Sequence, residues 1–163
     1  MGLWRFLVRD DRWLEVEDDF VNSAGHFKNA VALFRRGGFD VPDIGGYAAG
    51  MAFMHAMQAG HTSLENGLKR ILTILNEDHP AGESWHSDLI RRVSRVTAKR
   101  PAILDAETCS FADETRRFRN IAARSYDSFR PQNAKAAVAA AEALAQRMLP
   151  ELLKFQDVID PSE

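Results

Sequence analysis

The sequence predicts an all-α fold, an antiparallel bundle of four to five helices. Apolar residues recur at intervals of three and four over long stretches, and no stretch alternates apolar and polar residues as a half-buried strand would. Short segments rich in turn residues separate these stretches, and short connections join neighbouring helices in opposite directions. An antiparallel bundle buries one apolar stripe of every helix.

The first two helices have clear local boundaries. The first is predicted over about Leu14 to Arg36, where Gly37-Gly38 would form its C-terminal cap. Pro42-Asp43 would open the second, which runs toward Asn76 and is the longest element. Its apolar positions follow helical spacing: Met54, Met57, Leu64, Leu68, Ile71 and Leu75.

Three further helices follow, each after a breaker and a residue suited to capping. Ser84 would cap a short third helix, and Asp105 would cap the fourth, soon after Pro101. After the loop at Pro131, Asn133 would cap an Ala-rich final helix. The apolar residues of that helix alternate in steps of three and four, which favours packing against an antiparallel partner: Val138, Ala141, Ala145, Met148, Leu152, Phe155 and Ile159.

Length and composition indicate one ordinary globular domain spanning 1–163. Hydrophobic residues make up 45% and charged residues 27% of its 163 residues. The net charge of −2 gives no global basicity, so any contact with nucleic acid must come from a local patch. A single cysteine, Cys109, fits a reducing compartment. The N-terminus lacks the apolar run of a signal peptide, and no stretch approaches the roughly 18 apolar residues of a spanning helix. We therefore expect a cytoplasmic protein.

The predicted fourth helix carries the most informative segment of the chain. The segment has no Pro or Gly, and Arg119, Ala122, Ala123 and Tyr126 share one helical face at spacings of three, four and seven. Asn120 follows Arg119 directly, and Arg124 comes two residues before Tyr126. This order resembles the signature of the HEPN superfamily, whose HepT branch has the pattern Arg-Asn-x-x-x-His-x-Tyr. Arg124 stands where that pattern has its histidine.

The resemblance is clearest over 47–159. It includes the start of the long helix at Tyr47, the Trp85-His86 start of the short helix, and Arg100-Pro101 ahead of the motif helix. HEPN domains are all-helical bundles, in agreement with the prediction from periodicity.

The resemblance implies a specific activity and specific partners. HEPN ribonucleases are homodimers whose motif helices face each other and form one cleft. They cleave RNA without a metal or cofactor: the ribose 2′-OH attacks the adjacent phosphate, the histidine transfers protons and the arginine stabilises the phosphorane. HepT toxins are paired with an MNT-type nucleotidyltransferase antitoxin, which transfers AMP to the motif tyrosine, here Tyr126.

By this resemblance Arg119 would hold the phosphate, since its rigid fork of donors matches phosphate oxygens. Asn120 would orient either the arginine or the scissile phosphate, and its alternative is a solvated side chain on the helix surface. A salt bridge is the alternative role for Arg119, with an acidic residue nearby in the sequence as its partner: Asp113, Glu114 or Asp127. Tyr126 would be the AMP acceptor or an aromatic residue packed at the helix end.

Arg124 decides how much catalysis is expected. Histidine transfers protons near neutral pH, whereas arginine stays protonated below about pH 12. Loss of general acid–base help typically costs about 10²–10⁴ in rate. The chain would then be a binding-only relative, a nuclease that uses another histidine, or a weak nuclease; we expect strongly reduced catalysis.

Five arginines and one acidic residue lie between Arg116 and Arg130. Such a cluster is either a solvated face or, in a dimer cleft, an RNA-binding surface that includes Arg116, Arg117 and Arg130. The main alternative function is a non-catalytic helical dimerisation or interaction module that binds a partner protein or a nucleotide.

The five histidines do not predict a metal site. A di-iron bundle needs two Glu-x-x-His pairs, and the chain has only Glu83-Ser84-Trp85-His86. His61 and Glu65 lie along the apolar stripe of the second helix, so we expect a buried hydrogen-bonded pair.

Overall fold

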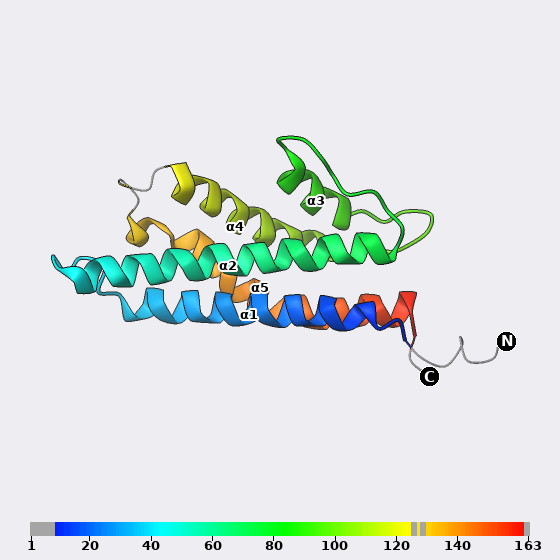
Figure 1. The fold of residues 1–163 in the computed structure, drawn as a ribbon, viewed down its shortest axis with the longest axis horizontal. Coiled ribbons are helices and arrows are strands. Elements are labelled where there is room, and N and C mark those ends of the chain that lie inside the picture. The colour runs from blue at the N-terminus through cyan, green and yellow to red at the C-terminus, as the bar shows by residue number, and fades with distance from the viewer. Residues whose placement is uncertain (1–8, 125–126, 128–129, 162–163) are drawn as a thin grey trace.

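The computed structural model describes residues 9–124, 127 and 130–161, and within these ranges the chain is helical and contains no strand. The all-α prediction is therefore confirmed. Five α-helices and one short 3₁₀ turn make up the described fold (Figure 1): α1 (Arg12–Arg36), α2 (Ile44–Ile74), α3 (Trp85–Val93), α4 (Ala106–Arg124), η2 (Pro131–Asn133) and α5 (Lys135–Ile159).

The two longest helices, α1 and α2, lie side by side in opposite directions and form the long axis of the molecule (Figure 1). Helix α5 packs on α1, and α4 packs on both α5 and α2. The short α3 packs on α4 and on the C-terminal half of α2 (Figure 1). Residues from α2, α3 and α4 therefore meet at one place on the bundle.

Three predicted helix ends are confirmed by their hydrogen bonds. Gly37 adopts a φ of 69° after α1, and its backbone N–H donates to the carbonyl of Leu33. The Asp43 carboxylate accepts from the backbone N–H of Gly45 at 2.7 Å, and Asp105 accepts from Thr108 at the same distance.

Two predicted caps are wrong. Ser84 precedes α3, but its hydroxyl donates to the Asp88 carboxylate at 2.9 Å, because its backbone lacks the extended conformation that lets a capping side chain face the helix. Asn133 belongs to the 3₁₀ turn, so Ala134 stands immediately before α5 and no side chain caps that helix.

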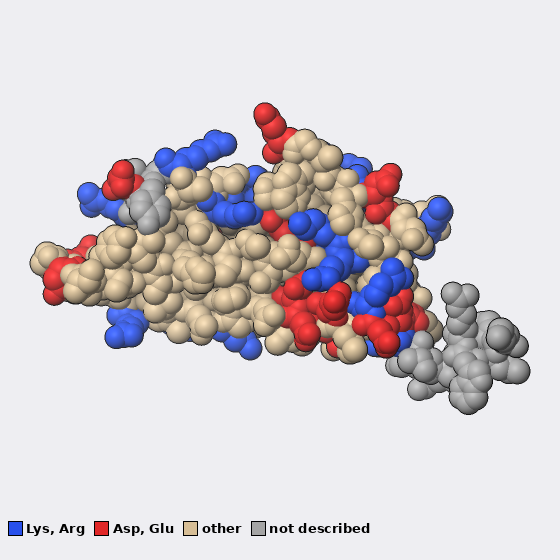
Figure 2. Space-filling view, in the orientation of Figure 1, with Lys and Arg blue, Asp and Glu red and all other residues tan. Residues whose placement is uncertain are grey.

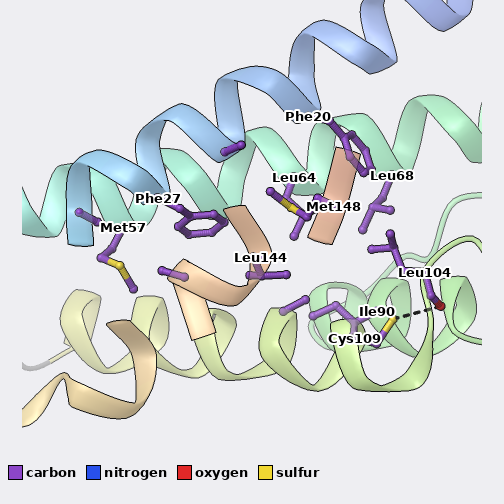
Figure 3. Packing of buried hydrophobic residues seen from close by; sticks show 14 of the residues in the cluster. Phe20, Phe27, Met57, Leu64, Leu68, Ile90, Leu104, Cys109, Leu144 and Met148 are labelled. Carbon is purple, nitrogen blue, oxygen red and sulfur yellow. Dashed lines mark hydrogen bonds between the residues drawn. The ribbon is translucent and has the colours of Figure 1, made fainter. Parts of the chain in front are cut away.

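The predicted apolar stripes of α2 and α5 meet α1 and α4 in one core (Figure 3). Phe20 of α1 lies near Leu68 of α2, and Phe27 lies farther along α1, on the side of Met57 (Figure 3). Cys109 is also buried there, and its Sγ contacts the carbonyl of Leu104. Burial, then the charges of Glu151 and Asp105, raise the pKa of the Cys109 thiol to about 12, so this thiol stays protonated.

Two glycines of α2 let α1 approach closely. A Cβ at Gly60 would lie 2.6 Å from the ring of Phe27, and a Cβ at Gly67 would lie 2.7 Å from the ring of Phe20. The seven-residue spacing of the glycines matches that of the two phenylalanines, so each ring occupies the space that a side chain on α2 would fill.

Gly67→Ala should therefore destabilise the protein by about 1–3 kcal/mol, although alanine is the better helix former. Gly50→Ala is the matched control in the same helix, because a Cβ there meets nothing within 4 Å. It should add about 0.4–1 kcal/mol of stability. Urea unfolding of both variants measures this, and equal changes would contradict the close-contact explanation.

Candidate functional site

A buried carboxylate joins three helices where α2, α3 and α4 meet. The side chain of Glu65, on α2, is only 4% exposed. Its Oε1 lies 3.0 Å from Nε2 of His61 and 2.5 Å from Nδ1 of His86, on α3. Its Oε2 accepts from Nη1 of Arg119, on α4, at 3.1 Å. We call these four residues the Glu65 cluster.

Helical spacing explains why these side chains converge. His61 and Glu65 are four residues apart, so they lie on the same face of α2. Thr115 and Arg119 are also four apart, and both turn from α4 toward that face. His86 lies in the first turn of α3. The predicted buried pair of His61 and Glu65 is confirmed.

The inner side of the cluster is closed and hydrogen-bonded. His61 is fully buried, and its Nδ1 lies 2.9 Å from the hydroxyl of Thr115. An ionised carboxylate only accepts hydrogen bonds, so both imidazoles that contact Glu65 donate an N–H to it. His61 therefore anchors the carboxylate from behind.

The Glu65 carboxyl remains ionised at neutral pH. Burial raises its pKa, but the hydrogen bond and charge of His61, followed by those of His86, lower it by more, so the net pKa lies below the usual 4.5. The cluster thus contains a stable negative charge that holds cationic or N–H-bearing side chains around it.

The outer side of the cluster reaches solvent. The side chain of Arg119 is 32% exposed and that of His86 is 27% exposed, and Nη1 of the arginine lies 3.5 Å from Nδ1 of the histidine. The indole of Trp85 stacks on the His86 ring with centroids 3.6 Å apart. A guanidinium and an imidazole side by side can bind an anion and transfer a proton.

The alternative role predicted for Arg119 is half right. It does form a salt bridge, but its partner is Glu65, 54 residues earlier, and none of the three acidic residues near it in the sequence. Asp113, one of those three, instead pairs with Arg116 at 2.7 Å and with Arg117 at 2.8 Å.

The other two motif residues that the structure describes make no hydrogen bond with the cluster. Asn120 and Arg124 are exposed on α4. Five residues along an α-helix correspond to a rotation of about 140°, so Arg124 lies on a different side of α4 from Arg119. The structure does not bring Arg124 into the Glu65 cluster of the same chain. Arg130 is exposed in the loop before η2, and Tyr126 lies outside the described residues.

His86 is a site residue that the sequence did not predict. In the sequence, Trp85-His86 only adds to the family resemblance, and helical spacing relates His86 to Glu83, whereas in the structure its ring contacts Glu65. Across the described ranges, no three His, Cys, Asp or Glu side chains are arranged to hold a metal ion. Nor does any described helix have the length and hydropathy to cross a membrane.

Comparison with known proteins identifies the family. A family model described as HepT-like protein matches residues 52–159, which include the whole Glu65 cluster. No curated protein and no solved structure matches the chain. The matched range covers well over half of the 163 residues and contains the motif helix. The chain belongs to the HepT-like protein family.

Proposed function

We propose that the chain is a HepT-type toxin of a toxin–antitoxin pair, a metal-independent endoribonuclease or a catalytically weakened relative of one. The observation that supports this most is the position of Arg119, the motif arginine. It is held at the protein surface by a buried carboxylate and lies beside an imidazole. RNA cleavage by attack of the 2′-OH requires a fixed cation at the phosphate and a group that transfers protons.

Arg119 is suited to hold a phosphate. Glu65 engages Nη1, and the remaining guanidinium donors make no hydrogen bond to any other described residue. A guanidinium that is already oriented loses little freedom on binding, and its planar fork matches two phosphate oxygens. Arg119 would therefore stabilise the negative charge that develops on the phosphorane.

A homodimer through the motif helix is part of this proposal. Figure 2 shows a broad surface without Lys, Arg, Asp or Glu over the N-terminal half of α2, and the sequence has no such residue between Asp43 and Glu65. Phe53 of α2 and Phe118 of α4 are buried and contact each other edge-on, so the motif helix packs against the half of α2 that carries this surface. Depletion of charge is typical of the centre of protein interfaces.

The nuclease proposal is tested with purified protein and RNA in the presence of a chelator. Arg119→Ala should lower the cleavage rate by about 10²–10³, because it removes the cation at the phosphate. Arg124→His restores the family motif and should cleave at least as fast as the unaltered chain. Arg35→Ala, which removes an exposed arginine of α1, is the control and should change little. If Arg124→His cleaved no faster than Arg119→Ala, the nuclease proposal would be wrong.

Neutralisation by an MNT-type nucleotidyltransferase requires its own experiment. After co-expression with such an enzyme, mass spectrometry should find AMP on Tyr126 and none on Tyr126→Phe. The chain has two tyrosines, so the exposed Tyr47 is an internal control for specificity. AMP on Tyr47, or on neither tyrosine, would exclude Tyr126 as the acceptor.

A non-catalytic dimerisation or interaction module is the second candidate function. It is favoured by Arg124, which cannot act as a general base, and by the uncharged α2 surface, which suits a protein partner. Capture of a partner protein without RNA, together with no cleavage by any variant, would support it. A chain that stays monomeric in solution would contradict both candidates, since both use this surface.

A further inference from the structure

We propose that His86 transfers the proton that the motif histidine would transfer in related enzymes. This inference rests on the proposed RNA cleavage and names the residue that makes it possible without a histidine at position 124. His86 comes from α3, outside the motif helix, yet it lies beside the motif arginine.

The geometry leaves the correct nitrogen of His86 available. Its Nδ1 is 2.5 Å from the ionised Glu65 carboxylate, which accepts an N–H, so Nδ1 carries the proton. In the neutral ring the lone pair then lies on Nε2, which makes no hydrogen bond with any other described residue. A carboxylate that fixes the tautomer in this way is the usual means of orienting a catalytic imidazole.

The ring is also held in place. Trp85 stacks on it at an interplanar angle of 28°, and Nζ of Lys69 lies 4.9 Å from the centre of the Trp85 ring. Behind the ring, Glu65 is anchored by His61, which in turn contacts Thr115. Glu65 is therefore a positioning residue, and it orients His86 and Arg119 together.

No other histidine is suited to this role. His61 is fully buried, and both of its ring nitrogens are engaged. His26 and His55 pack against each other between α1 and α2, and His79 bonds to the hydroxyl of Thr73. All five histidines are described, and only His86 has a ring nitrogen in polar contact with Arg119.

The reaction balances with this single base. Nε2 of His86 takes the proton from the 2′-OH, the 2′-oxygen bonds to phosphorus, and the bond from phosphorus to the 5′-oxygen breaks. The leaving oxygen takes a proton from water, and the hydroxide that remains takes back the proton from His86. The products are a 2′,3′-cyclic phosphate and a 5′-hydroxyl, and the enzyme returns to its starting state.

The test is metal-free cleavage of a short RNA of defined sequence, followed by analysis of the product ends. His86→Ala should cleave about 10²–10⁴ times more slowly than the unaltered chain. Added imidazole should restore part of the lost cleavage rate of His86→Ala, because a free imidazole can occupy the vacated space. It should restore none of the lost cleavage rate of Arg119→Ala.

Glu65→Gln should also cleave more slowly, since an amide no longer fixes the Nδ1–H tautomer of His86. His79→Ala is the matched histidine control and should keep full activity.

Three outcomes would overturn the proposal. If the unaltered chain and His86→Ala cleave equally, His86 is not the base, while the nuclease function stands. If His86→Ala is slow, gains nothing from imidazole and shows loss of helix by circular dichroism, its role is structural. If neither the unaltered chain nor Arg124→His cleaves RNA, the nuclease function fails and this proposal fails with it.

Discussion

Replacing Glu65 with leucine is expected to lower the free energy of unfolding by about 3–5 kcal/mol, because it removes the acceptor shared by three donors. His61 would be left fully buried with one ring nitrogen unpaired, and Arg119 and His86 would lose the group that holds them. Loss of one partner from a buried charged pair leaves the other desolvated without compensation. Urea unfolding monitored by circular dichroism measures the difference.

The control and the pH dependence make this prediction specific. Glu142→Leu removes a half-exposed glutamate that pairs with the exposed Arg35, and it should cost no more than about 1 kcal/mol. Because the folded state lowers the pKa of Glu65, its ionised form adds stability above the unfolded value of 4.5. This contribution to the free energy of unfolding is lost as the pH falls through the pKa that Glu65 has in the folded protein. The difference between the unaltered chain and Glu65→Leu should therefore narrow below pH 4.5, and a constant difference would contradict the role given to the charge.

Arg100→Met is expected to cost about 3–5 kcal/mol, because the guanidinium of Arg100 holds the connection between α3 and α4. Its side chain is only 2% exposed. It donates to the Glu77 carboxylate and also to the backbone carbonyls of Arg95 and Pro101 at 3.0 and 3.1 Å. Methionine would fill a similar volume but would leave all of these acceptors without their donor.

Arg91→Met is the control for this variant. Arg91 is largely exposed on α3 and pairs loosely with Asp88, so its loss should change stability by less than about 1 kcal/mol. Thermal unfolding of the two variants should separate them clearly. Equal stability would mean that solvent replaces the Arg100 contacts without loss.

The helices were predictable because their signals are local. The cap at Asp43 and the glycine after α1 act within one turn of the chain, so a single sequence contains the whole interaction. The predicted caps at Ser84 and Asn133 are wrong because competing local structure is decided only in the folded chain. The Ser84 hydroxyl bonds to Asp88, and Asn133 is part of the 3₁₀ turn before α5.

The candidate site was only partly predictable. The motif identified Arg119, and helical spacing identified the pair of His61 and Glu65, since both patterns lie within one helix. The contact between Arg119 and this pair was not predictable, because Glu65 lies 54 residues before Arg119 in the sequence. His86 was missed for the same reason: its partner lies 21 residues away on another helix.

Glu65 lies between Gly60 and Gly67, the two positions where α1 presses its phenylalanine rings against α2. A segment wedged in this way can neither rotate about its axis nor slide along its neighbour without collision. The carboxylate is therefore the fixed reference point of the site, and α3 and α4 are aligned to it. Ligand binding should therefore move His86 and Arg119 while Glu65 stays where the paired helices place it.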